Sequence, residues 1–331
     1  MKRKKQPFFY LTVSLLVFVL TTTFLTIFVL LRLLSSPLAS HSSLSSTPSR
    51  SFFRDFLPHP PTRKSQPTLT TLIAVGDIML GRYCNVQMLK QKDFRYPFLK
   101  IADLISSADI AFANLEAPLV EDCPTTPTGM IFCARPEAVQ GLKFAGFDIL
   151  SLANNHILNY GQKGLKQTQS FLSSADILYS PLSSSDNPTI KPINNIKFGF
   201  LSFDLVTYPQ TSPLSLISQI SPTVDILIVS LHWGNEYQTQ PSPSQTQLAH
   251  QIIEAGAKVI LGHHPHVIQP VEEYKGGLIF YSLGNFVFDQ SWSEETKKGI
   301  IAKIIFAGKE IKSYKTLPIY IQNYCQPTLS Q

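Results

Sequence analysis

The sequence predicts a layered α/β fold for residues 68–331, preceded by a membrane segment and a flexible stalk. Three observations lead to this organisation. After residue 67, short apolar runs alternate with longer amphipathic runs, which is typical of strands buried on both faces and connected by helices. A long charge-free segment follows a basic N-terminal tip. A Ser- and Pro-rich stretch then separates this segment from the alternating region.

The N-terminal segment has the length and composition of a membrane anchor. Four basic residues, Lys2–Lys5, precede a run from Phe8 to Leu31 that contains 24 residues without a charge. As a helix rising about 1.5 Å per residue, such a run reaches roughly 36 Å, enough to cross a hydrocarbon core of about 30 Å. The basic tip should remain in the cytoplasm. A cleavable signal peptide usually has a shorter apolar stretch. We therefore expect residues 1–34 to be an uncleaved, single-pass anchor in the cell membrane, with the main domain extracytoplasmic.

Residues 35–67 read as a flexible stalk because Ser, Pro, Thr and Arg dominate them. A segment of this composition cannot bury enough apolar surface to offset the entropy lost on ordering. Residues 68–331 are long for a single domain, but α/β domains of that size are common. We therefore expect one folded domain after the stalk.

The distribution of charge argues against a nucleic acid partner. The net charge of the chain is +6, but residues 1–34 carry five positive charges and residues 35–65 carry a further net +3. The region after Ser65 therefore has a net charge of −2. It has no basic excess with which to neutralise a phosphate backbone.

The alternating region contains apolar runs that we expect to form strands and amphipathic runs that we expect to form helices. The expected strands are Leu72–Val75, Ile110–Ala113, Ile149–Ala153, Phe198–Phe203, Ile226–Leu231, Val259–Leu261 and Leu278–Ser282. The expected helices are Pro136–Ala145, Gln162–Ser174 and Ser244–Ala255. In the last helix, Leu248, Ile252 and Ile253 recur at helical spacing and Gly256 marks the end.

Polar groups with metal-binding chemistry follow five of these strands. The motifs are Gly76-Asp77, Asn114-Leu115-Glu116, Asn154-Asn155-His156, His232-Trp233-Gly234 and Gly262-His263-His264-Pro265-His266. Because the carboxyl ends of strands in an α/β sheet face one crevice, we expect these side chains to converge. Asp, Glu, Asn and His together suit one or two divalent ions such as Mn, Fe or Zn. Two such ions would clamp a phosphoryl or carbonyl group and lower the pKa of a bridging water, which is hydrolytic chemistry.

Each of these residues also has an ordinary structural explanation. A strand-end Asp such as Asp77 often caps a following helix. Asn154 and Asn155 are common turn residues, and His232 alone could be a hydrogen-bonded, half-buried histidine. Three histidines within four positions after an apolar strand are harder to explain by packing, because apolar neighbours disfavour imidazoles that lack partners. The cluster therefore favours a metal site.

At these residues the sequence resembles the capsule-synthesis family of the calcineurin-like metallophosphatase superfamily, which is associated with poly-gamma-glutamate capsule production. The matching segments, in order, are Val75–Arg82, Asn114–Pro118, Ala153–His156 with Tyr160-Gly161, Leu231–Tyr237, Gly262–Val267 and Tyr281–Phe286. The resemblance implies a two-sheet sandwich flanked by helices (α/β/β/α), with the site at one edge of the sheets.

The resemblance also implies a set of site residues. The metal ligands it implies are Asp77, Glu116, Asn155, His232, His264 and His266. Glu116 takes the place of the carboxylate that bridges two metals. His156 matches the histidine that protonates the leaving group or steadies the transition state. Arg82 and His263 are candidates for substrate contact, although Arg82 could instead shape its loop. Glu236, Glu272 and Asn285 could support the ligands, or be solvated or turn residues.

Two departures from the wider phosphatase pattern affect the metal site. The usual Asp-x-His of the first motif reads Asp77-Ile78-Met79, so one imidazole ligand is missing. The usual bridging Asp is Glu116, which has a longer reach. Both leave the number and identity of the metals open, because a thioether is a poor ligand for hard divalent ions.

Two of the four cysteines bracket a short loop. Cys123 and Cys133 enclose Pro124, Pro127 and Gly129. Outside the cytoplasm these cysteines could pair and restrain the loop. The alternative is two reduced loop cysteines.

Three functions are compatible with this sequence. The first is a metal-dependent hydrolase or transferase that acts on a phosphoester or on an amide of an anionic polymer, working with other capsule-synthesis membrane proteins. The second is a non-catalytic component that binds or exports the polymer on the same fold, and Met79 is the observation that favours it. The third is a periplasmic nucleotidase or phosphodiesterase.

Overall fold

The structure is a computed structural model that describes residues 68–182, 187–210 and 212–330. The expected membrane anchor (residues 1–34) and stalk (residues 35–67) lie outside these residues. Among the described residues, the helices are all too short or too polar to cross a bilayer.

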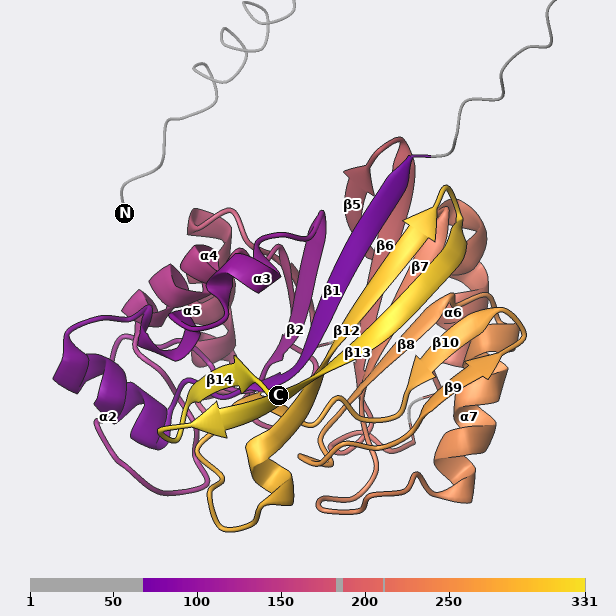
Figure 1. The fold of residues 1–331 in the computed structure, drawn as a ribbon. Coiled ribbons are helices and arrows are strands. Elements are labelled where there is room, and N and C mark those ends of the chain that lie inside the picture. The colour runs from indigo at the N-terminus through magenta and orange to yellow at the C-terminus, as the bar shows by residue number, and fades with distance from the viewer. Residues whose placement is uncertain (1–67, 183–186, 211, 331) are drawn as a thin grey trace, which may run out of the picture. The chain divides into compact units, whose positions relative to one another are not determined.

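Two mixed β-sheets form the centre of the described region (Figure 1). The first sheet has the order β14-β13-β12-β1-β2-β3-β4, and β11 also pairs with β1. Strands β1 to β4 and β11 run parallel, whereas β12 to β14 add an antiparallel meander. The strands of this sheet are β1 (Leu69–Ile78), β2 (Ile110–Leu115), β3 (Ile149–Ser151), β4 (Leu178–Ser180), β11 (Asn285–Val287), β12 (Lys298–Ala307), β13 (Glu310–Gln322) and β14 (Gln326–Leu329).

The second sheet has the order β5-β6-β7-β8-β10-β9. Its four inner strands are parallel, and its two edge strands are antiparallel to their neighbours. The strands of this sheet are β5 (Thr189–Ile193), β6 (Ile196–Asp204), β7 (Ile226–His232), β8 (Val259–His263), β9 (Val271–Tyr274) and β10 (Gly277–Phe280).

Helices cover both sheets on their outer sides. Figure 1 shows the first group of helices beside β2 and the second group beside β8 and β10. The first group is α2 (Arg82–Gln91), α3 (Ala102–Ile105), α4 (Val139–Ala145) and α5 (Gly161–Ser174), and the second is α6 (Leu214–Ile220) and α7 (Pro243–Glu254). Short 3-10 turns lie at Tyr96–Phe98, Pro136–Ala138, Ser221–Thr223 and Glu295–Lys297. Helix α7 begins where it does because Ser242 caps it, with Gln245 completing a capping box.

Alternate residues of the central strands supply separate apolar cores. In β1, Leu72 and Ala74 pack in a core that also contains Phe198 and Ile226 of the second sheet, so this core lies between the sheets. The intervening Ile73 packs in a different core together with the first group of helices. A third core joins the second sheet to α6 and α7. This division follows from the two-residue period of a strand.

The α/β class and the seven expected strands are confirmed, as are the three expected helices, with ends that shift by a few residues. The expected strands did not include the meander β12 to β14. Most of β13 is half-buried or exposed and has no apolar run, whereas β12 is a mostly buried apolar strand whose signal was present in the sequence. The structure also excludes the helix-capping explanation for Asp77. Strand β1 continues through Ile78, and Gly81 is the N-cap of α2.

Strand β1 comes into backbone contact with the segment before β11. The N–H of Asp77 donates to the Gly284 carbonyl at 3.1 Å. A Cβ atom placed on Gly76 would lie 1.9 Å from that carbonyl oxygen. Only glycine therefore allows these two segments to approach so closely.

We predict that Gly76→Ala lowers the free energy of unfolding by at least about 3 kcal/mol, the upper end of the usual cost of overpacking, because the obstructing atoms are backbone and cannot rotate away. Denaturant unfolding of the purified protein measures this change. Gly308→Ala is the control, because its Cβ would meet no atom within 4 Å and only its φ of +59° is unfavourable. That control should cost about 1 kcal/mol. Equal losses in the two variants would contradict the contact.

Candidate metal centre

The polar ends of the two sheets meet at one edge, as the sequence predicted. In the first sheet, Asp77 lies in register with Asn114 on one side and with Asn285 on the other. In the second sheet, His232 lies in register with His263. A contact of 3.0 Å between His263 Nδ1 and Asp77 Oδ1 joins the two rows. Parallel pairing therefore brings together groups that are far apart in sequence.

Asp77 is a fully buried carboxylate with donors on both oxygens. Its Oδ1 accepts from Asn114 Nδ2 at 2.9 Å and from His263 Nδ1 at 3.0 Å. Its Oδ2 accepts the backbone N–H of His264 at 3.2 Å. Burial alone would raise the pKa of Asp77, but hydrogen bonds from His263 and His266 hold this pKa well below its ordinary value. Asp77 is therefore ionised.

Glu116 is equally buried but has no hydrogen-bond partner for either carboxylate oxygen. Its Oε1 lies 3.7 Å from His266 Nε2 and 3.9 Å from His232 Nε2. Burial, followed by repulsion from Asp77, raises the pKa of Glu116 well above its ordinary value. Buried polar atoms in native proteins nearly always have a partner. A cation between these groups would supply the partner that Glu116 lacks.

Two groups of side chains could each hold a metal ion, because the ligand atoms within each group lie within 4.8 Å of one another. One group is Asp77, Glu116 and His232, and the other is Glu236, His264 and His266. Carboxylate oxygens and imidazole nitrogens are the donors that Zn²⁺, Mn²⁺ and Fe²⁺ accept. The unpartnered oxygens of Glu116 and this donor set both fit a divalent cation.

The hydrogen bonds of His266 fix which ring nitrogen is free. Asn285 donates its amide to Gln290 and to the Thr296 carbonyl, so its Oδ1 is the acceptor that faces His266. His266 Nδ1 lies 3.0 Å from that oxygen and must carry the proton. The lone pair is then on Nε2, the nitrogen nearest Glu116. A partner on the far nitrogen is the usual way in which a ligating histidine is oriented.

His232 and His264 are held in the neutral form that a ligand requires. Burial, followed by repulsion from His264, lowers the pKa of His232 well below its ordinary value. Burial and His266 lower the pKa of His264 to about 4. His232 Nε2 also lies 2.9 Å from Asn155 Oδ1, which brings the implied ligand Asn155 into the same cluster.

The loop that carries the histidines has an unfavourable backbone. His264 and His266 adopt φ angles of 95° and 56°. Residues other than glycine rarely occupy this region, and each such residue costs on the order of 1–3 kcal/mol. Such strain accumulates at functional sites, where the surrounding structure holds it in place.

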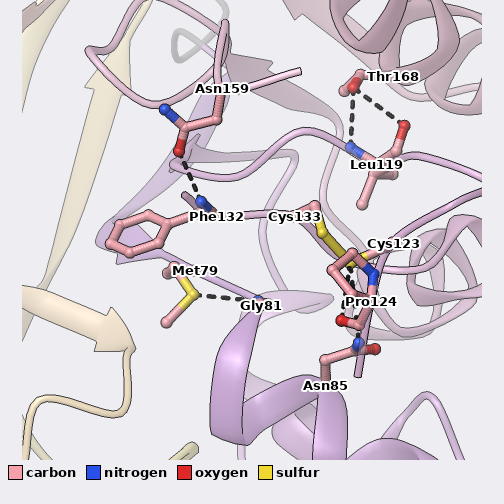
Figure 2. Close-up of a disulfide and its surroundings, with 10 residues drawn as sticks. All are labelled: Met79, Gly81, Asn85, Leu119, Cys123, Pro124, Phe132, Cys133, Asn159 and Thr168. Atoms are coloured by element: carbon pink, nitrogen blue, oxygen red, sulfur yellow. Dashed lines mark hydrogen bonds between the residues drawn. A yellow bond between two sulfur atoms is a disulfide. The ribbon is translucent and has the colours of Figure 1, made fainter. Parts of the chain in front are cut away.

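His156 is oriented by Asn159 and by the disulfide-bonded loop. Asn159 Oδ1 accepts the Phe132 N–H at 2.6 Å (Figure 2). The same oxygen lies 3.1 Å from His156 Nδ1. The ring of Phe132 stacks on His156 with centroids 3.9 Å apart. The disulfide between Cys123 and Cys133, which the sequence suggested, is formed and adjoins Phe132. His156 Nδ1 therefore carries a proton shared with Asn159, which leaves Nε2 free.

Arg82 and His263, the two candidates for substrate contact, have structural partners. The Arg82 guanidinium pairs with Asp289 and donates to the Gly129 carbonyl, so it holds the loop against α2. Arg82 has a φ of 46°, which these contacts stabilise. His263 is 1% exposed and contacts Asp77 through Nδ1.

Three residues take part in the site besides the ligands that the resemblance implied, and of these only Asn159 was not named from the sequence. Asn114 links Asp77 to His232, to which its amide nitrogen is 3.4 Å away. Asn159 orients His156. Glu236, expected only to support the ligands, stands with His264 and His266. The position of Asn114 at a strand end was a usable signal, but Asn159 and Glu236 lie in loops whose path no pattern gave.

Comparison with known proteins agrees with the resemblance drawn from the motifs. Residues 71–290 match the family described as bacterial capsule synthesis protein PGA_cap. The chain is 34% identical over 268 residues to the capsule biosynthesis protein CapA of Bacillus anthracis, covering 73% of this chain and 65% of that protein. It is 33% identical over 249 residues to the PGA biosynthesis protein CapA of Bacillus subtilis (strain 168), covering 69% and 65%. The matches therefore span just under two thirds of each relative.

A solved structure supports the fold. The chain aligns with the crystal structure of a hypothetical protein from Thermus thermophilus with a TM-score of 0.51 and 15% identity. The alignment covers 76% of this chain and all of that one. At this identity the similarity concerns the fold alone.

We predict that binding of a divalent cation releases protons and tightens as the pH rises. The raised pKa of Glu116 means that a proton competes with the cation for its oxygens. His232 and His264 have lowered pKa values and contribute little to this release. Calorimetric titration with Mn²⁺ in two buffers of different ionisation enthalpy measures the released protons. Enthalpies that do not depend on the buffer would contradict the prediction.

We also predict that Cys123→Ser with Cys133→Ser lowers the free energy of unfolding by about 2–4 kcal/mol, the usual effect of a disulfide that closes a short loop. Denaturant unfolding with and without reductant measures this change. Reduction of the parent protein should reproduce the loss and should leave the double variant unchanged. A parent protein that is insensitive to reductant would show that the disulfide contributes nothing.

Proposed function

This chain belongs to the bacterial capsule synthesis protein family, and we propose that it is a divalent-cation-dependent hydrolase or transferase of capsule or poly-gamma-glutamate polymer biosynthesis. Its site and sheets would be metallophosphatase-like. Two relatives whose names refer to capsule and PGA biosynthesis support the biological setting. The substrate would be an amide of an anionic polymer or a phosphoester.

One observation carries the cation-dependent part of this proposal. Both carboxylate oxygens of Glu116 are buried without a hydrogen bond. They lie beside ionised Asp77 and near the Nε2 atoms of His232 and His266. Without a cation, the cost of two adjacent buried carboxylates falls only when one of them or an adjacent imidazole takes up a proton. A structural role alone does not explain a carboxylate that is placed in this way.

The proposed ligands are Asp77, Glu116, Asn155, His232, His264 and His266. When bound, one or two ions such as Mn, Fe or Zn would polarise a phosphoryl or carbonyl oxygen and lower the pKa of a water. His156 would donate a proton to the leaving group from Nε2 in its imidazolium form, since Nδ1–H is engaged by Asn159. Burial lowers the pKa of His156, which makes that imidazolium a stronger acid. Stacking on Phe132 would keep the ring in that orientation.

We further propose the organisation that the sequence predicts around this domain. Residues 1–34 would anchor the chain in the cell membrane with a cytoplasmic N-terminus, and residues 35–67 would form the stalk. Residues 68–331 would then lie outside the cytoplasm, where the disulfide can form. There the domain would meet the polymer and other capsule-synthesis membrane proteins.

A second candidate is a non-catalytic protein that binds or exports the polymer. The observation that favours it is Met79, which replaces a ligand histidine and is fully buried, with its sulfur accepting the Gly81 N–H at 3.1 Å. Such a protein would bind polymer without a cation and without His156.

We predict that His156→Ala lowers kcat by about 10²–10⁴-fold, the usual contribution of a general acid, with bound cation unchanged. The assay measures turnover of gamma-glutamyl polymers and a phosphoester panel by the full-length protein, together with its metal content. His250→Ala is the control, because His250 contacts Glu272 and Tyr274 at a separate position.

Two results would count against an enzyme. One is a purified protein without stoichiometric divalent metal. The other is unchanged activity in His232→Ala and His266→Ala. Polymer binding that persists without metal and in His156→Ala would favour the second candidate instead. Turnover of nucleotides or phosphodiesters alone would identify a nucleotidase or phosphodiesterase.

A further inference from the structure

The first strand of the site lacks one expected donor. At position 79 the side chain is a thioether that packs in the core with the first group of helices and is fully buried. Its sulfur is engaged by the Gly81 N–H. Met79 therefore has neither the chemistry nor the freedom to bind a hard divalent ion.

Glu236 brings a carboxylate to the other side of the same cluster. It lies on the segment that follows β7, and a carboxylate oxygen is within 4.8 Å of ring nitrogens of His264 and His266. No residue of the first sheet belongs to this group, which is distinct from the group of Asp77, Glu116 and His232. The two groups are connected through the 3.7 Å contact between His266 Nε2 and Glu116 Oε1.

The segment that carries Glu236 is fixed at both ends to the histidine loop. Before it, the N–H of Trp233 donates to the His263 carbonyl at 3.1 Å. After it, the N–H of Tyr237 donates to the Pro265 carbonyl at 2.8 Å. Tyr237 adopts a φ of 64°, which a non-glycine residue accepts only when its surroundings impose it. Glu236 is therefore held against these imidazoles by the backbone on either side.

The imidazoles of this group have unused donor capacity. His264 is 6% exposed, and its Nδ1 has no hydrogen-bond partner. His266 uses Nδ1 on Asn285 and keeps the lone pair of Nε2. One carboxylate and two imidazoles form a complete set for a first-row divalent ion that also binds water or substrate.

We propose that Glu236 is a direct cation ligand, so that Glu236, His264 and His266 bind one divalent cation while Asp77, Glu116 and His232 bind a second. This inference rests on the proposed cation dependence. It goes further in giving Glu236 a direct bond to one of the ions.

The test uses the full-length protein in detergent, with Mn²⁺ as the probe. The parent protein should bind two Mn²⁺ per chain, measured by calorimetry and metal analysis, and give the electron paramagnetic resonance spectrum of a coupled pair. Glu236→Gln keeps the shape but removes the charge. This variant should lower the affinity for one of the two ions by more than about 100-fold. That loss exceeds the 10–100-fold loss of affinity expected when only a supporting partner is removed. The remaining ion should give the spectrum of isolated Mn²⁺.

Two further variants complete the design. Glu254→Gln is the matched control, since this exposed glutamate pairs with Lys275 on the surface, and it should bind two ions like the parent. Glu236→His restores a ligand and should recover part of the lost affinity. The melting temperature of each variant confirms that it is folded.

Each remaining outcome overturns a definite claim. Two ions of parental affinity in Glu236→Gln would show that Glu236 is not a ligand. A single ion that is insensitive to Glu236→Gln but lost in Asp77→Asn would refute this inference and leave the proposed function standing. A parent protein that binds no Mn²⁺ would refute both this inference and the proposed cation-dependent function.

Discussion

Two fully buried carboxylates side by side are the constraint around which this site is organised. Asp77 and Glu116 are both inaccessible to solvent, and an ionised carboxylate in that position costs several kcal/mol unless it is compensated. For Asp77 the compensation is visible, because three donors converge on it, one from Asn114 and two from the adjacent residues His263 and His264. For Glu116 no protein group provides it. The protein groups therefore compensate the charge of Asp77 but not that of Glu116.

Much of the fold follows from the sequence by elementary patterning. Apolar runs buried on both faces identify the strands, and the polar residue after each run identifies the edge at which the site lies. Within the meander β12 to β14, β12 carries an apolar run that predicts a strand. Most of β13 is half-buried or exposed, so its pairing with β12 depends on tertiary contacts and not on a local pattern. Pairing of β1 with both β2 and β12 depends on contacts across the whole sheet and not on the sequence of β1 alone.

For the site, the sequence identified the carboxylates and histidines that are candidates for cation binding, but not the residues that hold them in position. The carboxylates and histidines at strand ends came together because parallel strands in register require it. Asn159 was not predicted, and Glu236 was expected only as a supporting or solvated residue, for a physical reason. Each lies in a loop whose course depends on specific backbone hydrogen bonds, such as that from Tyr237 to Pro265. No periodicity encodes contacts of this kind, and the same is true of the Phe132 ring that stacks on His156.

The position of β1 in its sheet has a consequence for how the chain reaches its working state. This strand opens the described domain, yet its neighbours β11 and β12 come from near the other end, with Leu72 paired to Ile304 and Asp77 in register with Asn285. Contacts of such long sequence separation form slowly, because the intervening chain must first be closed into a loop. An emerging chain therefore carries an unpaired β1 edge until almost all of its length has been delivered. Protection of that edge from other chains becomes a requirement of biogenesis, and Asp77 lacks its register partner Asn285 until the last strands arrive.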